Sequence, residues 1–404
     1  MKITFASNYF NHHQLPFCEA LAACGGVDFL FVEQMAMDEE RRAMGWADDL
    51  LKPPFVVRLS QENREEIRER ILESDVFLIG GDGFDDLIDR RLRMGRPVVR
   101  ISERIYREGQ WKAVSPRGLL HKHRQYVRYK NMPYYLLCAG AYAASDFALI
   151  GAFPGKMYKW GYFPVLRTYP DGLPQTKLRA DGAVSTPGKG GPVRLCFAAR
   201  MIPLKHPEYA LYLAARIRER AGKDPCGRGI LLDMIGGGEL EEIMRAKAAA
   251  DGLADIVTFH GAKTPEEVRN IMETADIFLF PSNHLEGWGT VINEAMNSGC
   301  AVIAGAAAGA APFLIRHGEN GLLFRNEDKE DMAGKALQLI DDPARIRAMG
   351  RAAYRTVLDS WNAQEAAERF YDFCRCVTTG GTFDAPQEGP LSPAEVIRPF
   401  VRPQ

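Results

Sequence analysis

Short apolar runs alternate with longer amphipathic stretches through the first half of the chain. This alternation is typical of a parallel β-sheet covered by helices. We predict strands at residues 2–6, 27–31, 76–79 and 97–101, and helices at 14–23, 61–73 and 85–94. The helical pattern continues over residues 134–144 and precedes a predicted buried strand at 147–150.

A second alternating series begins at Val193. Its predicted strands lie near residues 194–198, 230–235, 256–259, 277–280, 301–304 and 322–324, and two helices follow at 344–357 and 363–377. Residues 170–192 are rich in glycine and proline and poor in large apolar side chains, a composition typical of a linker.

The two series predict two doubly wound, Rossmann-like α/β domains, and the length of 404 residues favours two domains over one or three. We place the first domain at residues 1–170, the linker at 171–192, the second domain at 193–360, a helix at 361–378 and an irregular tail at 379–404.

Composition narrows the functional classes. A net charge of −1 argues against nucleic acid as a partner, because neutralising phosphates requires a cationic surface. The sequence holds no apolar stretch of transmembrane length. The first residues enter a strand pattern directly, which predicts no signal peptide, and the eight cysteines form no CxxC pair. We therefore expect a reduced, cytoplasmic protein.

The richest segment runs from Pro281 to Ile303 and contains two carboxylates eight positions apart, Glu286 and Glu294. A Gly-Trp-Gly turn, Gly287 to Gly289, lies between them. Apolar runs on either side predict strand, loop, helix and strand. A glycine loop that opens a helix at the end of a parallel strand is a binding place for an anionic ligand.

Six ordered segments across residues 193–325 resemble the retaining glycosyltransferases of family 4, also known as glycosyl transferases group 1. Glu286 and Glu294 resemble the family's E-x7-E signature, and Arg200 and Lys205 its cation pair after a strand. The other segments begin at Leu232, Val257, Ala275 and Gly318. The resemblance implies the GT-B fold: two Rossmann-like domains that face each other across a cleft, with a C-terminal helix returning to the N-terminal domain.

The resemblance also implies a catalytic set. Arg200 and Lys205 stabilise the diphosphate that leaves a nucleotide sugar, as planar and compact cations respectively. Two permanent cations replace a divalent metal, so no metal is expected. Glu286 orients hydroxyls of the donor sugar, and Glu294 accepts hydrogen bonds from the ribose.

Further donor contacts are implied by the same resemblance. They come from two glycine turns and from the loop that carries Glu286. An alternative for Trp288 is a packing role, and His260 is expected to act through its main chain rather than its ring. These donor-binding residues are Gly236, Gly237, His260, Gly261, Gly287, Trp288, Gly289, Thr290 and Val291.

The first domain resembles the family less. Where many members have a Gly-Gly pair, this chain has the segment that begins with Asn8 and continues through Tyr9, Phe10 and Asn11. Gly81 and Asp82 form a second acceptor-side candidate. Glu103 stands where many members carry a histidine, and we assign it to the catalytic set. The alternative is that Glu103 pairs with Arg100, Arg104 or Arg107.

Residues 117–130 hold five lysines and arginines, two histidines and no acid. This segment is a candidate for peripheral contact with the inner face of a membrane, and the alternatives are an acidic glycan as partner or a solvated helix face.

Taken together, the sequence predicts a metal-independent, retaining hexosyltransferase. It would move a hexose from a UDP- or GDP-sugar to a glycan or lipid-linked saccharide in the synthesis of cell-surface polysaccharide. Two alternatives remain open at this point: a non-catalytic nucleotide-sugar-binding protein and a sugar-nucleotide epimerase of the same fold.

Overall fold

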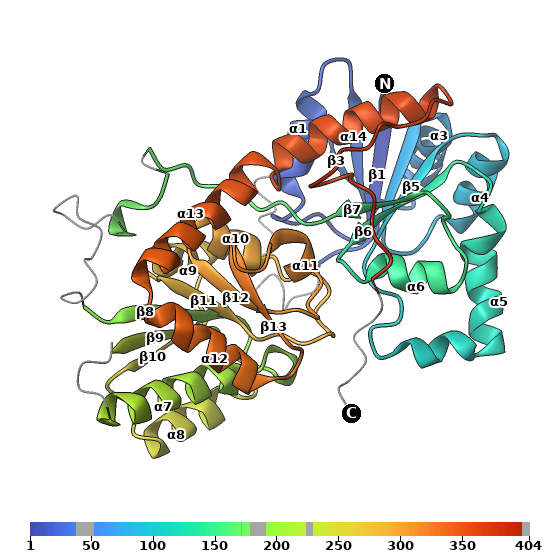
Figure 1. Cartoon of the computed structure of the whole chain (residues 1–404). Coiled ribbons are helices and arrows are strands. Elements are labelled where there is room, and N and C mark those ends of the chain that lie inside the picture. The colour runs from blue at the N-terminus through green and yellow to red at the C-terminus, as the bar shows by residue number, and fades with distance from the viewer. Residues whose placement is uncertain (38–51, 171, 178–190, 224–228, 398–404) are drawn as a thin grey trace. The chain divides into compact units, whose positions relative to one another are not determined.

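The computed structural model describes residues 1–37, 52–170, 172–177, 191–223 and 229–397 (Figure 1). The chain divides into two compact units. The first combines Met1–Val165 with the segment that begins at Ser360, and the second contains Leu166–Asp359. Both are helix-covered parallel sheets, which confirms the predicted pair of Rossmann-like domains. That they face each other across a cleft stays a prediction.

The first unit contains a seven-stranded sheet in the order β3-β2-β1-β4-β5-β6-β7, with every neighbouring pair parallel. Its strands are β1 Lys2–Ser7, β2 Asp28–Glu33, β3 Val56–Arg58, β4 Val76–Gly80, β5 Val98–Ser102, β6 Tyr134–Ala139 and β7 Met157–Trp160. The α-helices named here are α1 Leu15–Ala23, α3 Arg64–Glu73, α4 Asp85–Arg93, α5 Pro116–Gln125, α6 Ala143–Leu149 and α14 Ala363–Thr378.

The second unit contains a six-stranded parallel sheet in the order β10-β9-β8-β11-β12-β13. Its strands are β8 Val193–Ala198, β9 Ile230–Ile235, β10 Val257–Gly261, β11 Ile277–Phe280, β12 Ala301–Gly305 and β13 Gly321–Phe324. The helices are α7 Pro207–Lys223, α8 Glu241–Ala250, α9 Pro265–Met272, α10 Val291–Asn297, α11 Ala311–Leu314, α12 Lys329–Ile340 and α13 Pro343–Asp359.

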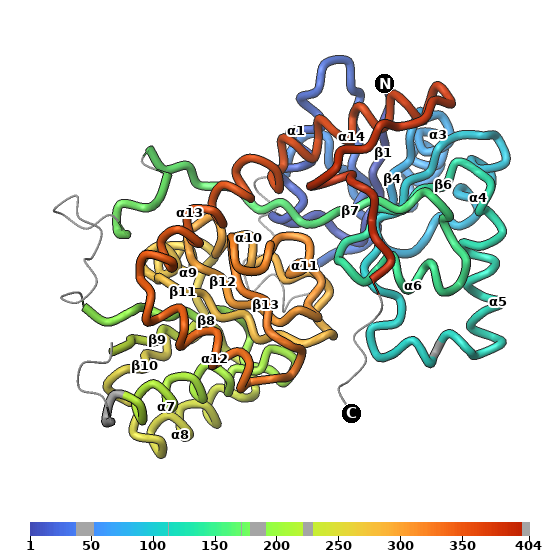
Figure 2. The backbone as a smooth tube through the Cα atoms, viewed as in Figure 1, coloured from blue at the N-terminus to red at the C-terminus, as the bar shows by residue number. Residues whose placement is uncertain are grey.

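Helices cover both faces of the first sheet, so its central strands are apolar on both sides. Phe77 and Ile79 of β4 pack in a core cluster with Ile67 of α3 and Leu87 of α4. On α1, the ring of Phe17 lies 5.9 Å from the ring of Phe370 on α14. Helix α14 therefore belongs to the first unit and runs along α1 (Figure 2), as the predicted returning helix requires.

One assignment in the first unit is wrong. Residues 134–144 were predicted as a helix and 147–150 as a strand, whereas the structure has β6 first and α6 second. A short apolar run does not distinguish a buried strand from a buried helix. Asp146 of α6 is fully buried, and its carboxylate accepts bonds from the Tyr106 amide at 2.9 Å and the Arg104 side chain at 3.2 Å. These contacts hold the helix in place.

The tail was predicted to be irregular, and the described residues 379–397 contain neither helix nor strand. It nevertheless packs against the edge of the first sheet. The Leu391 amide donates to the Lys159 carbonyl at 2.8 Å, and the Lys159 amide donates to the Ser392 carbonyl at 2.8 Å. Ala394 donates to Met157 at 3.0 Å. The tail thus covers the backbone groups that the edge strand β7 would otherwise expose.

The predicted linker is described over residues 172–177 and 191–192, and the first of these parts packs on the second unit. Leu173 is buried. The Thr176 hydroxyl donates to the Glu273 carbonyl at 2.6 Å. The chain enters this unit at Leu166, where the Arg167 amide donates to Asn297 Oδ1 at 2.8 Å.

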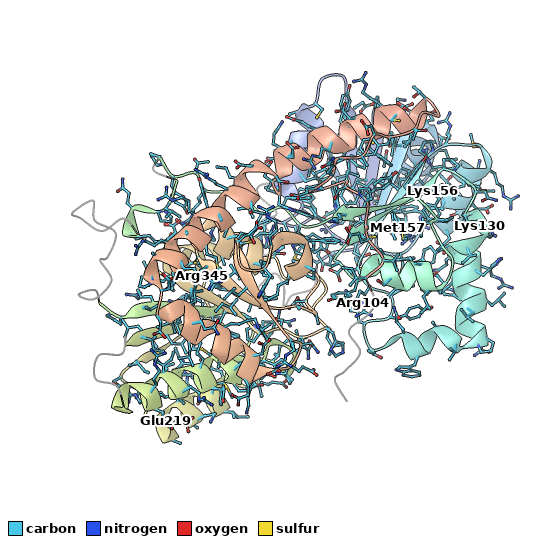
Figure 3. The ribbon with its side chains drawn as sticks, viewed as in Figure 1. Arg104, Lys130, Lys156, Met157, Glu219 and Arg345 are labelled. Carbon is cyan, nitrogen blue, oxygen red and sulfur yellow. The ribbon has the colours of Figure 1, made fainter. Side chains whose placement is uncertain are left out.

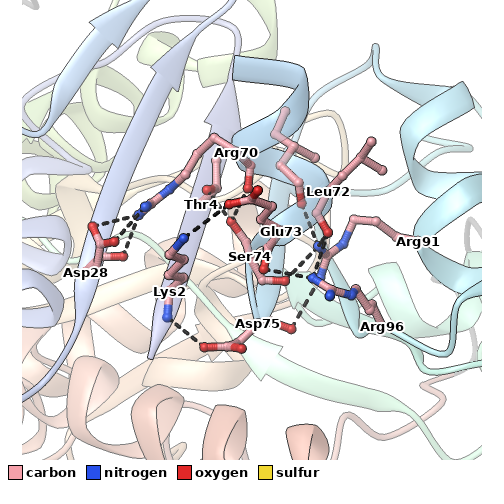
Figure 4. Close-up of polar contacts among 11 residues, drawn as sticks. Lys2, Thr4, Asp28, Arg70, Leu72, Glu73, Ser74, Asp75, Arg91 and Arg96 are labelled. Atoms are coloured by element: carbon pink, nitrogen blue, oxygen red, sulfur yellow. Dashed lines mark hydrogen bonds and ion pairs between the residues drawn. The ribbon is translucent and has the colours of Figure 1, made fainter. Parts of the chain in front are cut away.

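Arg91 of α4 is fully buried and serves as a polar anchor in the first unit. Its guanidinium donates to backbone carbonyls at the end of α3 and at the starts of β4 and β5 (Figure 4). The acceptors are Ile71 at 2.5 Å, Leu72 at 3.3 Å, Ser74 at 2.8 Å, Asp75 at 3.2 Å and Pro97 at 2.9 Å. Burial lowers the pKa of Arg91 to about 9.

Replacing Arg91 with methionine is expected to destabilise the first unit by about 2–4 kcal/mol, because buried carbonyls lose their donors. Urea unfolding would measure the loss. The control is Arg93→Met on the same helix, since the Arg93 side chain is 68% exposed and pairs with Asp89 at the surface. Equal unfolding midpoints for the two variants would contradict the assigned role.

Candidate functional site

In the second unit, the predicted catalytic residues gather at the carboxyl edge of the sheet. Because β8 and β11 are parallel neighbours, the loops that follow them meet there. The Asn283 amide after β11 donates to the Leu204 carbonyl after β8 at 3.0 Å. This bond joins the loop that carries Lys205 to the loop that carries Glu286.

Lys205 and Glu286 form an ion pair between Nζ and Oε2. Their side chains are 13% and 14% exposed, so both are shielded yet reachable. Lys205 ends a short 3-10 turn, Pro203–Lys205, and its Nζ lies 5.6 Å from the ring centre of Phe280. The structure thus brings together two residues that lie 81 positions apart in the sequence.

Arg200 lies two residues past the end of β8 and is exposed. It occupies the same loop as Lys205, and its carbonyl accepts the Ile202 amide at 3.0 Å. Its exposure leaves the guanidinium accessible to an anion.

Glu294 lies on the first turn of α10 and is half-buried. Burial raises its pKa to about 7, and the opposing effect of Arg269 is smaller. Arg269 is itself buried and donates to Ser298 Oγ at 3.2 Å and to Asn297 Oδ1. Glu294 is therefore a carboxylate whose charge changes near neutral pH.

The glycines after β9 allow two loops to approach closely. Gly236 has φ +119°, and a Cβ atom there would lie 2.0 Å from the Ala199 carbonyl oxygen. Gly238 has φ +148°, with a Cβ position 2.5 Å from the Met201 carbonyl oxygen. Between them, the Gly237 carbonyl accepts the Met201 amide at 2.8 Å. These glycines fix the loop after β8, a role that the sequence had not separated from ligand contact.

Trp288 differs from the donor-contact prediction. It is 1% exposed, and its Nε1 donates to Asn293 Oδ1 at 3.0 Å. The indole packs under the loop beside Phe313, which is the alternative role considered above. Neighbouring Gly289 has φ +92°, and a Cβ there would lie 2.5 Å from the ring of Phe280.

The backbone amides predicted to contact the donor lie at and just before the first turn of α10. They belong to Gly287, Gly289, Thr290 and Val291. The Ile292 amide donates to the Gly289 carbonyl at 3.0 Å. Amides that precede this bond have no partner within the helix, because a helix leaves its first amides unpaired. Their contact with a ligand stays a prediction.

His260 and Gly261 end β10. The His260 ring nitrogen Nε2 lies 2.8 Å from Asp233 Oδ1, and Arg194 donates to Asp233 Oδ2 at 3.3 Å. The Gly261 carbonyl accepts the Gly236 amide at 2.8 Å. The imidazole is thus held by a buried carboxylate.

A second polar cluster, which no sequence pattern predicted, lies beside Lys205. His206 has φ +46°, its Nδ1 lies 2.8 Å from Glu208 Oε1, and its Nε2 lies 3.3 Å from Asn283 Nδ2. Asn283 also donates to Glu327 Oε1 at 3.1 Å. These side chains connect the loops after β8, β11 and β13. A histidine in a left-handed turn has no periodic pattern, so sequence analysis missed it.

In the first unit, three predicted acceptor-side residues lie close together. Asn8 follows β1, and Gly81 and Asp82 follow β4, the adjacent strand. A Cβ at Gly81, where φ is +99°, would lie 2.5 Å from Asn8 Oδ1. Arg100, buried on β5, donates to the Gly81 carbonyl at 2.7 Å and fixes this turn. Asn8 and Asp82 are exposed.

The rest of that segment serves the fold. Phe10 is buried and packs 4.8 Å from Phe31, and its amide donates to Glu33 Oε1 at 2.9 Å. The Asn11 carbonyl accepts the Leu15 amide at 3.2 Å at the start of α1. Phe10 therefore offers neither side chain nor amide to an acceptor, which corrects the prediction. Tyr9 is half-buried between the exposed Asn8 and this anchor.

Glu103 follows β5 and lies in a polar cluster. Its Oε1 accepts the Tyr162 hydroxyl at 3.0 Å, and its Oε2 pairs with Arg107. Arg104 pairs with Asp146 instead. The pairing alternative is thus the observed arrangement, although the Glu103 side chain keeps 23% of its surface exposed. Nearby, burial lowers the pKa of His13 to about 3, with His12 contributing less.

Within residues 1–37, 52–170, 172–177, 191–223 and 229–397, no group of three or more metal-ligating side chains gathers around one point. In that same part of the chain, no helix combines the length and the apolar character that crossing a bilayer requires.

The second half of the chain is similar in sequence to known proteins. Residues 184–356 match the family described as glycosyl transferases group 1. A GDP-mannose-dependent alpha-(1-6)-phosphatidylinositol monomannoside mannosyltransferase of Mycobacterium tuberculosis (strain CDC 1551 / Oshkosh) is 31% identical over 190 residues, which cover 46% of this chain and 47% of that protein. A D-inositol 3-phosphate glycosyltransferase of Nocardia farcinica is 33% identical over 43% of this chain and 38% of its own length. The chain thus spans less than half the length of these relatives.

Solved structures support the fold of the whole chain. Anabaena HepE in complex with UDP superposes with a TM-score of 0.65 and 16% identity, covering 93% of this chain and all of that one. Sucrose-phosphate synthase from Thermosynechococcus elongatus gives a TM-score of 0.59 at 16% identity and covers 94% of this chain. These GT-B structures confirm the predicted fold class.

Proposed function

We propose that this chain is a retaining hexosyltransferase that uses a nucleoside diphosphate sugar, UDP- or GDP-linked, as its donor. The match of residues 184–356 to the glycosyl transferases group 1 family supports the proposal. The observation that carries the proposal is the shielded Lys205–Glu286 pair at the carboxyl edge of the second sheet. It lies where ligands of doubly wound sheets bind.

Lys205 and Arg200 act on the leaving diphosphate. Lysine has three N–H donors and Glu286 takes one of them, so Nζ keeps donors for phosphate oxygens. A cation held beside the developing negative charge lowers the barrier without reorganisation. Since Arg200 and Lys205 supply two positive charges, we propose that no divalent metal and no cofactor is needed.

Glu294 holds the ribose through its hydroxyls, since one carboxylate accepts bonds from two neighbouring donors. Glu286 orients the donor sugar. For retention we propose a front-face displacement, in which the leaving phosphate oxygen takes the proton of the acceptor hydroxyl. This assignment needs no protein nucleophile, unlike that of most retaining glycosidases.

The acceptor is a glycan or a lipid-linked saccharide in the synthesis of cell-surface polysaccharide, and the exposed Asn8 and Asp82 are its candidate contacts. We also propose that Glu103 orients a sugar hydroxyl through the exposed part of its carboxylate. We also propose a reduced, cytoplasmic setting. The described cysteines are free thiols, and the buried ones are Cys18, Cys138, Cys196, Cys300 and Cys374.

A donor screen tests the proposal. Thermal shift and slow hydrolysis would be measured with UDP-, GDP- and ADP-sugars, with and without EDTA. We expect stabilisation by one nucleotide series and release of the diphosphate that persists in EDTA. Release that stops in EDTA would refute metal independence. Binding to no nucleotide would overturn the function, and binding with no turnover, even with acceptor extracts, would favour a non-catalytic binding protein.

A further inference from the structure

Exposed large apolar side chains are concentrated in one short segment of the first unit. Among the described residues, ten such side chains are exposed, and four of them lie within residues 111–120. Trp111 is 69% exposed, Val114 78%, Leu119 40% and Leu120 52%. Such a concentration on a surface marks an interaction site, whereas single exposed apolar residues are ordinary.

Helix α5 turns its apolar side chains toward solvent, whereas a helix that packs on a core turns them inward. None of its described residues is buried. At 100° per residue, Leu119 and Leu120 lie on the outward side, together with Pro116 and His123. The half-buried Gly118, Lys122 and Gln125 lie on the opposite side, against the protein. The leucines therefore contribute nothing to the core of this unit.

Other residues hold the helix in place. Tyr126 and Tyr129 follow α5 and are both buried, with Tyr126 packed 5.2 Å from Phe147. At the end of the segment, the Lys156 ammonium donates to the Lys130 carbonyl at 3.0 Å (Figure 3). The outward leucines are thus presented on an anchored helix.

The charges that this segment itself carries have one sign. The sequence contains no acid between Glu108 and Asp146. Arg117 and Arg124 are exposed on α5, beside the apolar stripe. Arg128 also lies in this segment, but its charge is balanced by Asp89, which it pairs with at 3.1 Å. An outward apolar stripe with a tryptophan, bordered by arginines, matches a bilayer surface whose headgroups are anionic.

We propose that this docking face, consisting of Trp111, Val114, Leu119, Leu120, Arg117 and Arg124, binds an anionic membrane. The four apolar side chains enter the headgroup–acyl boundary, and the two arginines contact lipid phosphates. The inference deepens the proposed function and rests on its lipid-linked acceptor, since docking would bring the first unit to a substrate held in the bilayer. It also extends the predicted segment 117–130 to Trp111 and Val114.

The test is flotation of the full chain with vesicles of phosphatidylcholine, with and without 30% phosphatidylglycerol. We expect binding only with the anionic lipid, and loss of most binding when salt rises from about 50 to 500 mM, because screening weakens surface electrostatics. Leu119→Ser with Leu120→Ser should reduce binding at least tenfold, and Arg117→Gln with Arg124→Gln should do the same.

The matched control is Ile243→Ser, which removes an exposed apolar side chain of the second unit and should bind vesicles like the parent chain. Trp111 also provides a direct readout. Of the tryptophans that the structure describes, Trp160, Trp288 and Trp361 are buried. Because the sequence also contains Trp46, the readout uses a Trp46→Phe background, in which the blue shift of fluorescence on vesicles should vanish when Trp111→Phe is added.

Three results would overturn the proposal: equal binding of the double-leucine variant, equal binding to neutral vesicles, or a dimer in solution that the leucine substitutions dissociate. The last would assign the face to a second copy of the chain. Vesicle binding needs no donor, so its failure is distinct from failure of the donor screen, which needs no membrane.

Discussion

Replacing Lys205 with alanine is expected to reduce kcat by about 10²–10³, the effect of losing one preorganised charge at a developing anion. The side chain is 13% exposed, so its charge acts in a partly shielded site where electrostatic effects exceed those in water. The measurement is the rate of sugar transfer, or of donor hydrolysis if the acceptor is unknown, at saturating donor.

A structural explanation must be separated from this one, because removal of Lys205 leaves Glu286 without its partner. The reference is Glu286→Gln, because Glu286 itself orients the donor sugar. If Lys205 only balanced Glu286, adding Lys205→Ala to Glu286→Gln should cost no further activity. If Lys205 stabilises the leaving group, the double variant should turn over about 10²–10³ more slowly than Glu286→Gln alone.

Lys247→Ala is the matched control, since Lys247 makes an exposed ion pair with Asp251 at 2.8 Å on α8. Turnover in Lys205→Ala equal to that of this control would refute the phosphate assignment.

Replacing Glu294 with glutamine should weaken donor binding about 10- to 100-fold and at the same time stabilise the protein above neutral pH. A neutral amide accepts weaker hydrogen bonds from the ribose than a carboxylate does. The same carboxylate is costly to ionise, because burial raises its pKa to about 7. This one substitution would thus lower the affinity for the donor and raise the stability of the protein.

The pH dependence has a definite sign. A raised carboxyl pKa means that the folded state binds its proton more tightly than the unfolded state, so stability falls as pH rises from about 4.5 to about 7. Glu294→Gln should therefore increase the unfolding free energy by on the order of 3 kcal/mol at pH 8 and change it little at pH 4.5. Donor affinity of the parent chain should fall as pH drops below 7.

Denaturation and donor titration at pH 5 and pH 8 would measure both effects. The matched control is Glu242→Gln, because Glu242 also lies on the first turn of a helix, α8, but is exposed. A stability gain of equal size at both pH values would contradict buried ionisation of Glu294. Unchanged donor affinity would contradict its ribose contact.

Much of this protein could be predicted from its sequence. Parallel strands buried on both faces are written as continuous apolar runs, and all six strands of the second unit lie where those runs predicted them. The order of the segments then placed Lys205 and Glu286 at one edge of the sheet, because parallel neighbours end together. Sequence also located the returning helix α14 by its amphipathic pattern.

Only the tertiary structure decided which side chains of each loop are buried and which are exposed to a ligand. Trp288 and Phe10 lie in loops that the sequence predicted to bind a ligand, yet both side chains are buried. Their burial depends on neighbours that are distant in the sequence. The short runs around residues 134–150 fit helix or strand equally, and the buried contacts of Asp146 selected a helix. Local pattern thus predicted most of the elements and their order, whereas burial, charge pairing and the raised pKa of Glu294 arose from long-range contacts that no local pattern encodes.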